Sequence, residues 1–66
     1  MKNTIKVYRA MRNMTQEELA ERIRVTRRTI NSIEGDKYNP SIELAFRMAK
    51  LFGVPVEEMF SLDEES

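Results

Sequence analysis

The chain has 66 residues, enough for one small domain over residues 1–66, and it contains no cysteine and no histidine. The missing cysteines exclude disulfides and thiolate metal sites, and the missing histidines remove the commonest metal ligand and general base. The longest apolar run is too short to cross a membrane, and the N-terminus lacks the apolar segment of a signal peptide. We therefore expect a soluble cytoplasmic protein with no metal, no cofactor and no evident small-molecule ligand.

The net charge of zero conceals two oppositely charged ends. Residues 1–50 hold all 11 lysines and arginines and six of the 11 acids, whereas residues 51–66 hold five acids and no base. The first segment therefore carries +5 and the second −5. This asymmetry favours a basic face that binds a polyanion, with an acidic tail turned away from it. The alternative is that the arginines are ordinary solvated residues on helix surfaces.

Helical spacing and capping residues predict the first two helices. Ile5 and Tyr8 follow helical spacing in a helix from about residue 4 to residue 12, and Asn13 is suited to the left-handed conformation that closes a helix. The second helix begins with TQEE, where Thr15 is the N-cap and Glu18 completes a capping box. Its apolar face consists of Leu19, Ala20 and Ile23.

The third helix begins in the stretch TRRTINS, residues 26–32, which breaks a local rule. Thr26 is a good N-cap, so Arg27 and Arg28 occupy the first turn of the helix, with Ile30 and Ile33 facing inward. The N-terminal end of a helix carries a partial positive charge and favours acids over arginines. Because such local conflicts tend to lie at functional sites, this stretch is our first candidate for function.

Two further helices complete the predicted chain. After the loop DKYNP, Ser41 caps a fourth helix that ends at Gly53, with one apolar stripe formed by Leu44, Ala45, Met48, Ala49 and Phe52. The segment VPVEEMF predicts a final helix of one or two turns that starts at Pro55. Residues 61–66 form a tail that either frays or contributes a short extended segment at Leu62.

Two short helices joined by a tight turn over about residues 15–35 have the form of a helix-turn-helix. The segments TQEELA, TINSIEGDKYNPS and ELAFRMAKLFGV follow one another in an order and spacing that resembles the XRE family of Cro/cI-type regulators. The resemblance covers about residues 4–60. It implies an all-α, five-helix Cro/cI repressor-like DNA-binding domain, whose third helix lies in the major groove, usually as a dimer on a two-fold symmetric operator.

The resemblance gives the third helix the role of reading DNA bases. The N-terminal end of this helix points at base edges, where arginine bonds O6 and N7 of guanine and asparagine bonds N6 and N7 of adenine. The expected base-reading residues are Arg27, Arg28, Asn31 and Ser32. The alternatives are that one arginine contacts a phosphate or is solvated, and that Asn31 contacts only water or phosphate.

A second group of residues is expected to contact the DNA backbone. Gln16 follows the capping threonine at the start of the second helix, where the family binds a phosphate; an ordinary exposed glutamine is the alternative. The other members of this group are Arg24, Thr26, Thr29, Lys37, Tyr38 and Asn39. Thr29 is also suited to a thymine methyl group, Tyr38 to packing on the core, and Asn39 before a proline to ordinary turn chemistry.

The resemblance also implies one structural ion pair, between Arg9 and Glu34, which joins the first and third helices. The chain departs from the family at Arg24, where the short turn often has glycine. A left-handed conformation there would store strain of about 1 kcal/mol and would add a cation near the DNA backbone.

Surplus apolar residues indicate a homodimer. The fourth helix needs only one stripe for the core, and Ile42 and Phe46 form a second stripe beside it. Together with Phe60 and Leu62 they are expected to form a two-fold interface. The alternative is that the C-terminal segment of the same chain covers Ile42 and Phe46.

Two functions from different classes agree with these features. The first is a dimeric, sequence-specific DNA-binding transcriptional regulator that represses by occluding the polymerase. The second is an antitoxin-type interaction protein that binds a partner protein and also regulates its own gene. Arginines in the first turn of the third helix favour the first function, because an interaction surface is more often apolar there. The absence of cysteine, histidine and a glycine-rich phosphate loop argues against an enzyme, and the absence of stacking aromatics from the basic face argues against RNA binding.

Overall fold

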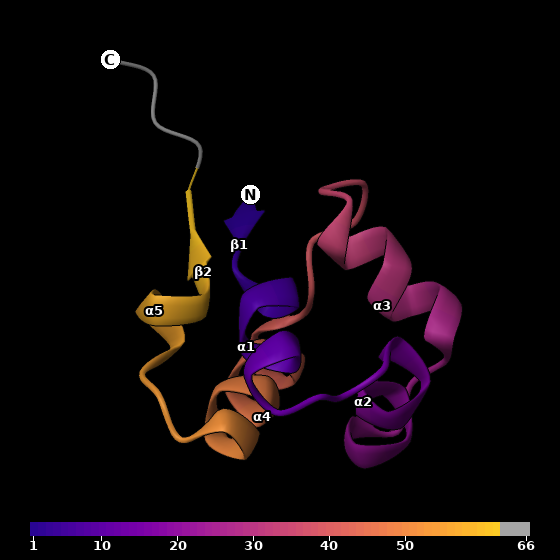
Figure 1. Ribbon diagram of the computed structural model, residues 1–66. Helices are drawn as coiled ribbons and strands as arrows, with labels where there is room; N and C mark the ends of the chain where they lie inside the picture. The colour runs from indigo at the N-terminus through magenta and orange to yellow at the C-terminus, as the bar shows by residue number, and fades with distance from the viewer. Residues whose placement is uncertain (63–66) are drawn as a thin grey trace.

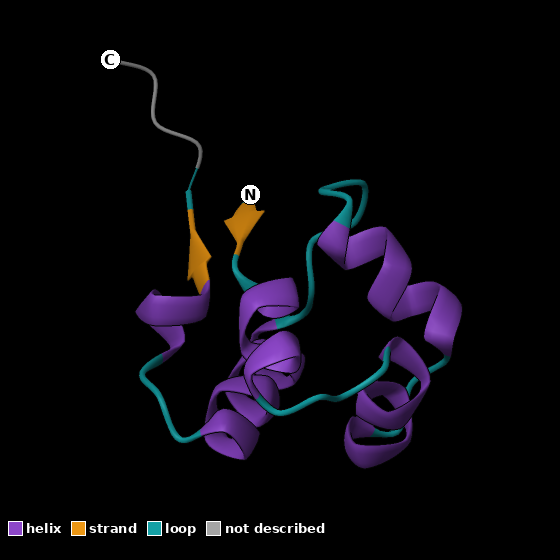
Figure 2. Ribbon diagram, in the orientation of Figure 1, coloured by secondary structure: helices purple, strands orange, loops and turns teal. Residues whose placement is uncertain are grey.

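The computed structural model describes residues 1–62, so Asp63, Glu64 and Glu65 of the predicted acidic tail lie outside the described residues. Within residues 1–62 five helices are present, as the sequence predicts, and two short strands pair residues 2–3 with residues 60–61 (Figures 1 and 2). In chain order the elements are β1 (Lys2–Asn3), α1 (Ile5–Met11), α2 (Gln16–Ile23), α3 (Arg27–Glu34), α4 (Ile42–Phe52), α5 (Val56–Met59) and β2 (Phe60–Ser61).

Side-chain caps start the three helices that position the candidate site. The predicted capping box is present at α2: Thr15 Oγ1 accepts a hydrogen bond from the Glu18 N–H at 3.0 Å, and the Glu18 carboxylate accepts one from the Thr15 N–H at 2.8 Å. Thr26 caps α3 by accepting from the Thr29 N–H at 3.2 Å. Ser41 caps α4 in the same way. Each cap satisfies a backbone N–H that has no partner within its helix.

Left-handed residues end the four longer helices. Asn13, Arg24 and Asp36 have φ values of 53°, 65° and 61°, and Gly53 has 72°. At each end a backbone N–H one residue further along donates to a carbonyl five residues back, such as Val25 N–H to the Ala20 carbonyl at 2.9 Å. This is the Schellman arrangement, which usually employs glycine at the left-handed position. Three of the four ends therefore place a side chain in a conformation that favours glycine.

All five helices contribute to one apolar core. The side chains with the least exposure are Ile5, Leu19, Ile30, Ile33, Met48 and Met59. In the view of Figure 1, α2 and α3 lie on one side of α1 and α4, and α5 with β2 lies on the other side. No helix among residues 1–62 has the length and apolar character needed to cross a bilayer.

The two strands pair antiparallel, with Lys2 opposite Ser61 and Asn3 opposite Phe60. The expectation that Phe60 belongs to an exposed dimer interface is wrong for this side chain, because Phe60 is 9% exposed and packs in the core. The strand pairing turns Phe60 inward, and the next residues, Ser61 and Leu62, are exposed. Strand β1 lies in a segment for which the sequence predicts no strand.

Two arginines stabilise helix ends far away in the chain. Arg12 donates to the carbonyl oxygens of Leu51 and Phe52 at 3.2 and 3.1 Å, and its guanidinium lies 5.2 Å from the centre of the Phe52 ring. Arg47 of α4 donates to the Ile23 carbonyl at 3.0 Å, at the end of α2. A cation at a helix C-terminus satisfies unpaired carbonyls and the helix dipole together. Arg12 and Arg47 therefore have structural roles at the C-terminal ends of α4 and α2.

Candidate nucleic-acid interface

The turn between α2 and α3 sets the direction of α3. Arg24 takes the left-handed conformation that the tight turn requires, with φ 65° and ψ 47°. Ile30 and Ile33 of α3 are buried against the core, so the opposite side of the helix is exposed. Arg27, Arg28 and Asn31 lie on this exposed side. The expected base-reading residues except Ser32, which is half-buried, therefore share one accessible surface.

The two arginines at the start of α3 have no acidic partner among residues 1–62. No acid lies in the first turn of α3, and the ion pair recorded among these residues joins Arg9 and Glu34 instead. Two positive charges therefore lie beside the positive end of the helix dipole without compensation from the described part of the chain. Such an arrangement is unfavourable in the free protein and becomes favourable when an anion binds there.

The hydroxyl groups of Thr26 and Thr29 are joined to each other at the start of α3. Their Oγ1 atoms lie 3.0 Å apart, and Thr26 Oγ1 also accepts from the Thr29 N–H. Thr26 is exposed and Thr29 is half-buried. Both hydroxyls thus take part in the cap, and each oxygen still has capacity for at least one further hydrogen bond.

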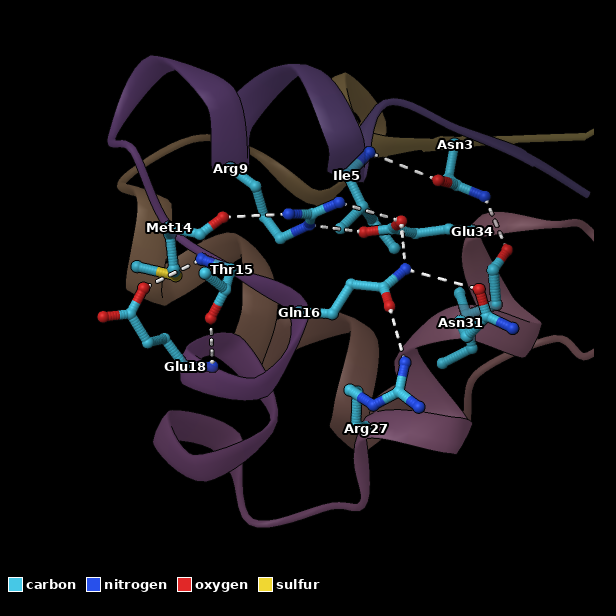
Figure 3. Close-up of polar contacts among 11 residues, drawn as sticks. Asn3, Ile5, Arg9, Met14, Thr15, Gln16, Glu18, Arg27, Asn31 and Glu34 are labelled. Atoms are coloured by element: carbon cyan, nitrogen blue, oxygen red, sulfur yellow. Dashed lines mark hydrogen bonds and ion pairs between the residues drawn. The ribbon is translucent and has the colours of Figure 1, made fainter.

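Arg9 and Glu34 form the ion pair that the family resemblance implies between α1 and α3. Arg9 Nε lies 2.6 Å from Glu34 Oε2, and a terminal guanidinium nitrogen lies 3.1 Å from Oε1 (Figure 3). The Glu34 side chain is 3% exposed and that of Arg9 is 15% exposed. Arg9 also donates to the Met14 carbonyl at 2.8 Å. The pair is therefore largely removed from water, and it fixes α3 against α1 and against the loop that follows α1.

Gln16 lies between this ion pair and the exposed side of α3. Its Nε2 donates to Glu34 Oε1 at 2.9 Å and makes a longer contact with Asn31 Oδ1 at 3.4 Å. Its Oε1 lies 3.5 Å from a guanidinium nitrogen of Arg27. The residue expected to contact a phosphate is thus connected to two residues that are expected to read bases (Figure 3).

The loop after α3 presents three polar side chains to solvent. Lys37, Tyr38 and Asn39 are all exposed, and Tyr38 at 52% exposure does not pack in the core. The loop begins with the left-handed Asp36, whose N–H donates to the Ile33 carbonyl at 3.0 Å. These residues are therefore accessible at the end of α3 that lies away from Arg27.

A residue that the sequence interpretation missed holds the same end of α3. Asn3 of β1 donates from Nδ2 to the Ile33 carbonyl at 2.8 Å and to Asp36 Oδ1 at 3.2 Å, while its Oδ1 accepts from the Ile5 N–H at 3.2 Å. The contact joins residues 30 positions apart, so no local pattern predicts it. Asn3 and Glu34 together fix the C-terminal half of α3.

A separate apolar surface consists of Ile42 and Phe46 on α4. They are 76% and 58% exposed, so the described part of the C-terminal segment does not cover them. Leu62 beyond β2 is 74% exposed. Val7 and Met11 of α1, four residues apart, are exposed as well. Residues 1–62 contain no cluster of acidic side chains that could hold a metal ion.

Comparison with known proteins agrees with this architecture. Residues 5–59 match the helix-turn-helix family. An HTH-type transcriptional regulator of Methanocaldococcus jannaschii is 51% identical over 65 residues, which is 98% of each chain. The cryptic phage transcriptional repressor RstR of Vibrio cholerae is 35% identical over 60 residues, which is 91% of this chain and 54% of RstR.

A solved structure shares the fold. The hypothetical transcription factor NHTF from Neisseria superposes with a TM-score of 0.76 at 24% identity, over 82% of this chain and 61% of that one. The match to residues 5–59 covers more than half of the chain, and the archaeal relative matches nearly all of it. The chain therefore belongs to the XRE family of helix-turn-helix transcriptional regulators.

Proposed function

We propose that this protein is a dimeric repressor that binds a two-fold symmetric DNA operator in the cytoplasm, with α3 in the major groove. The observation that carries the proposal is the pair of exposed arginines, Arg27 and Arg28, at the N-terminal end of α3 without an acidic partner in residues 1–62. In a helix-turn-helix, the N-terminal end of the motif's second helix, which is α3 in this chain, reaches base edges. Guanine O6 and N7 are the acceptors that arginine recognises best.

The residues around α3 divide by reach into base-reading and backbone-binding groups. Arg27, Arg28 and Asn31 are exposed and read bases, with Ser32 reaching a flanking position from its half-buried site. The backbone of the half-site is bound on both sides of α3. The residues in this role are Gln16 at the start of α2, Arg24 at its end, Thr26 and Thr29 at the start of α3, and Lys37, Tyr38 and Asn39 in the loop after α3.

The exposed surface of Ile42, Phe46 and Leu62 supports a dimer. A symmetric contact through this surface would cover large apolar side chains that the described chain leaves in water. Two copies would then place their α3 helices in successive major grooves about 34 Å apart. The named repressor RstR supports repression as the regulatory outcome.

Selection from a random duplex library at near-physiological salt tests the proposal. The expected result is a two-fold motif whose half-sites lie about one helical turn apart. Arg27→Ala or Arg28→Ala should remove the guanine preference at a defined position of each half-site. Weak binding that selects no motif and disappears steeply as salt rises would contradict sequence-specific recognition.

A transcription assay on a promoter that contains the selected motif tests repression. Adding the protein should reduce the transcript in proportion to operator occupancy, and an increase would make the protein an activator instead. The antitoxin-type alternative predicts a stable complex with a partner protein. The regulators described above favour DNA as the primary target.

A further inference from the structure

We propose that Asn3 is a positioning residue for the loop that follows α3, and that it holds this loop ready to bind the DNA backbone. The inference rests on the proposed function, because it concerns how one part of that interface is kept in place. Asn3 acts through the end of α3 and does not itself contact DNA. Its amide lies between the backbone of Ile5 and the C-terminal end of α3 (Figure 3).

The loop after α3 is ordered by hydrogen bonds more than by packing. Residues 35–39 are all exposed, so buried apolar contacts do little to fix their positions. The Asp36 N–H donates to the Ile33 carbonyl at 3.0 Å, and the Lys37 N–H donates to the Ser32 carbonyl at 2.9 Å. Asp36 has φ 61°, a conformation that is unfavourable for a residue with a side chain. A contact from outside the loop that supports this conformation therefore stabilises the loop.

The side chain of Asn3 supplies such a contact. Its Nδ2 donates to the Ile33 carbonyl at 2.8 Å and to Asp36 Oδ1 at 3.2 Å, and its Oδ1 accepts from the Ile5 N–H at 3.2 Å. A carbonyl and a carboxylate only accept and a backbone N–H only donates, so one orientation of the amide agrees with all three neighbours. Asn3 thereby connects the start of α1 to the last turn of α3 and to the loop.

The segment that carries Asn3 is itself fixed to the core. The Thr4 N–H donates to the Met59 carbonyl at 2.9 Å, and Thr4 Oγ1 donates to the Glu58 carbonyl at 3.0 Å. Asn3 lies opposite Phe60 in the pairing of β1 with β2, and both Met59 and Phe60 are buried. Asn3 is therefore anchored through α5 and β2, and its amide gives the exposed loop a fixed position relative to the core.

This position matters because both ends of α3 have to meet the same half-site. The helix has 8 residues and is therefore about 12 Å long, with Arg27 at its start and Lys37 beyond its end. Base contacts specify the sequence, whereas backbone contacts supply position and affinity. A loop that is ordered before binding loses less conformational entropy when it meets DNA. Loss of the Asn3 contact should therefore weaken backbone binding and leave the choice of bases unchanged.

The substitution Asn3→Asp tests this role with little change in shape. It keeps the oxygen that accepts from the Ile5 N–H, and it places a carboxylate oxygen against the Ile33 carbonyl and the Asp36 carboxylate. Binding to the duplex that the wild-type protein selects should weaken roughly fivefold, measured well below the melting temperature. The slope of log K against log salt concentration should fall by about one, because Lys37 loses a stable phosphate contact. Amide hydrogen exchange at Lys37 should become faster, and the selected motif should stay the same.

Two comparisons separate positioning from general effects. Ser61→Asp introduces the same charge on β2, at an exposed serine, and should change the affinity by less than about twofold because salt screens a charge outside the interface. In a double-mutant cycle, Asn3→Asp should have less than about a twofold effect when Lys37 is already Ala, and it should be additive with Arg28→Ala. Effects that are additive with Lys37→Ala as well would overturn the inference.

Exchange of donor and acceptor provides a rescue. Asp36→Asn retains a residue that tolerates the left-handed conformation, and combined with Asn3→Asp it restores a hydrogen bond between positions 3 and 36. The pair should recover most of the lost affinity and the wild-type salt slope. If Asn3→Asp does not fold, Asp36→Gly removes the same contact without backbone strain and should reduce the affinity and the slope in the same direction.

A lower melting temperature with unchanged affinity and salt slope would make Asn3 purely structural and would overturn the inference. So would an altered base preference with an unchanged slope. A wild-type protein that selects no motif would overturn the proposed function itself, so the two failures are distinguishable.

Discussion

Replacing Arg9 by Met should destabilise the domain more than most single substitutions. The change keeps the aliphatic part of the side chain and removes the guanidinium, which leaves the Glu34 carboxylate, 3% exposed, without its positive partner. An uncompensated buried charge of this kind costs about 3–5 kcal/mol. A domain of this size has a free energy of unfolding of roughly 3–10 kcal/mol in total. At the lower end of this range, the expected loss is therefore comparable to the whole free energy of unfolding.

Urea denaturation followed by far-ultraviolet circular dichroism measures this effect. The double variant Arg9→Met with Glu34→Leu replaces both charges by apolar groups and should recover most of the lost stability, because no charge is left buried. If Arg9→Met lowers the free energy of unfolding by less than about 1 kcal/mol, the ion pair is not desolvated in solution and the reasoning fails.

Three further predictions concern a helix end, a cap and the apolar surface. Arg24→Gly relieves the positive φ but makes the unfolded chain more flexible, so the free energy of unfolding measured in urea should rise by no more than about 1 kcal/mol. The slope of log K for DNA binding against log salt concentration should fall by about one, as expected for the loss of one phosphate contact. A loss of stability would refute strain at Arg24. Ser41→Ala removes the cap of α4 and should lower the free energy of unfolding by about 1 kcal/mol. The control Ser61→Ala, at an exposed serine, should leave the free energy of unfolding unchanged; equal effects of the two substitutions would disprove the capping role. Phe46→Asp should shift sedimentation equilibrium toward monomer, whereas Val7→Asp on α1 should not; the reverse would move the interface to α1.

Local signals were sufficient to predict the five helices. The capping box of Thr15 and Glu18, the cap at Thr26 and the stop at Gly53 depend on residues within one turn of each other, so the sequence alone places them. The buried faces of α2, α3 and α4 follow from apolar spacing for the same reason. The exposed arginines at the start of α3 also follow, because the direction of the buried face determines which side remains outside.

The sequence by itself thus determined the helices, their buried faces and the residues on the exposed side of α3. The tertiary structure decided what depends on contacts between distant residues. Strands of two residues carry no periodic signal, so only the pairing of β1 with β2 buries Phe60 and brings Asn3 to the end of α3. The hydrogen bond from Gln16 to Glu34, 18 positions away, likewise forms only because folding brings this donor and this acceptor together.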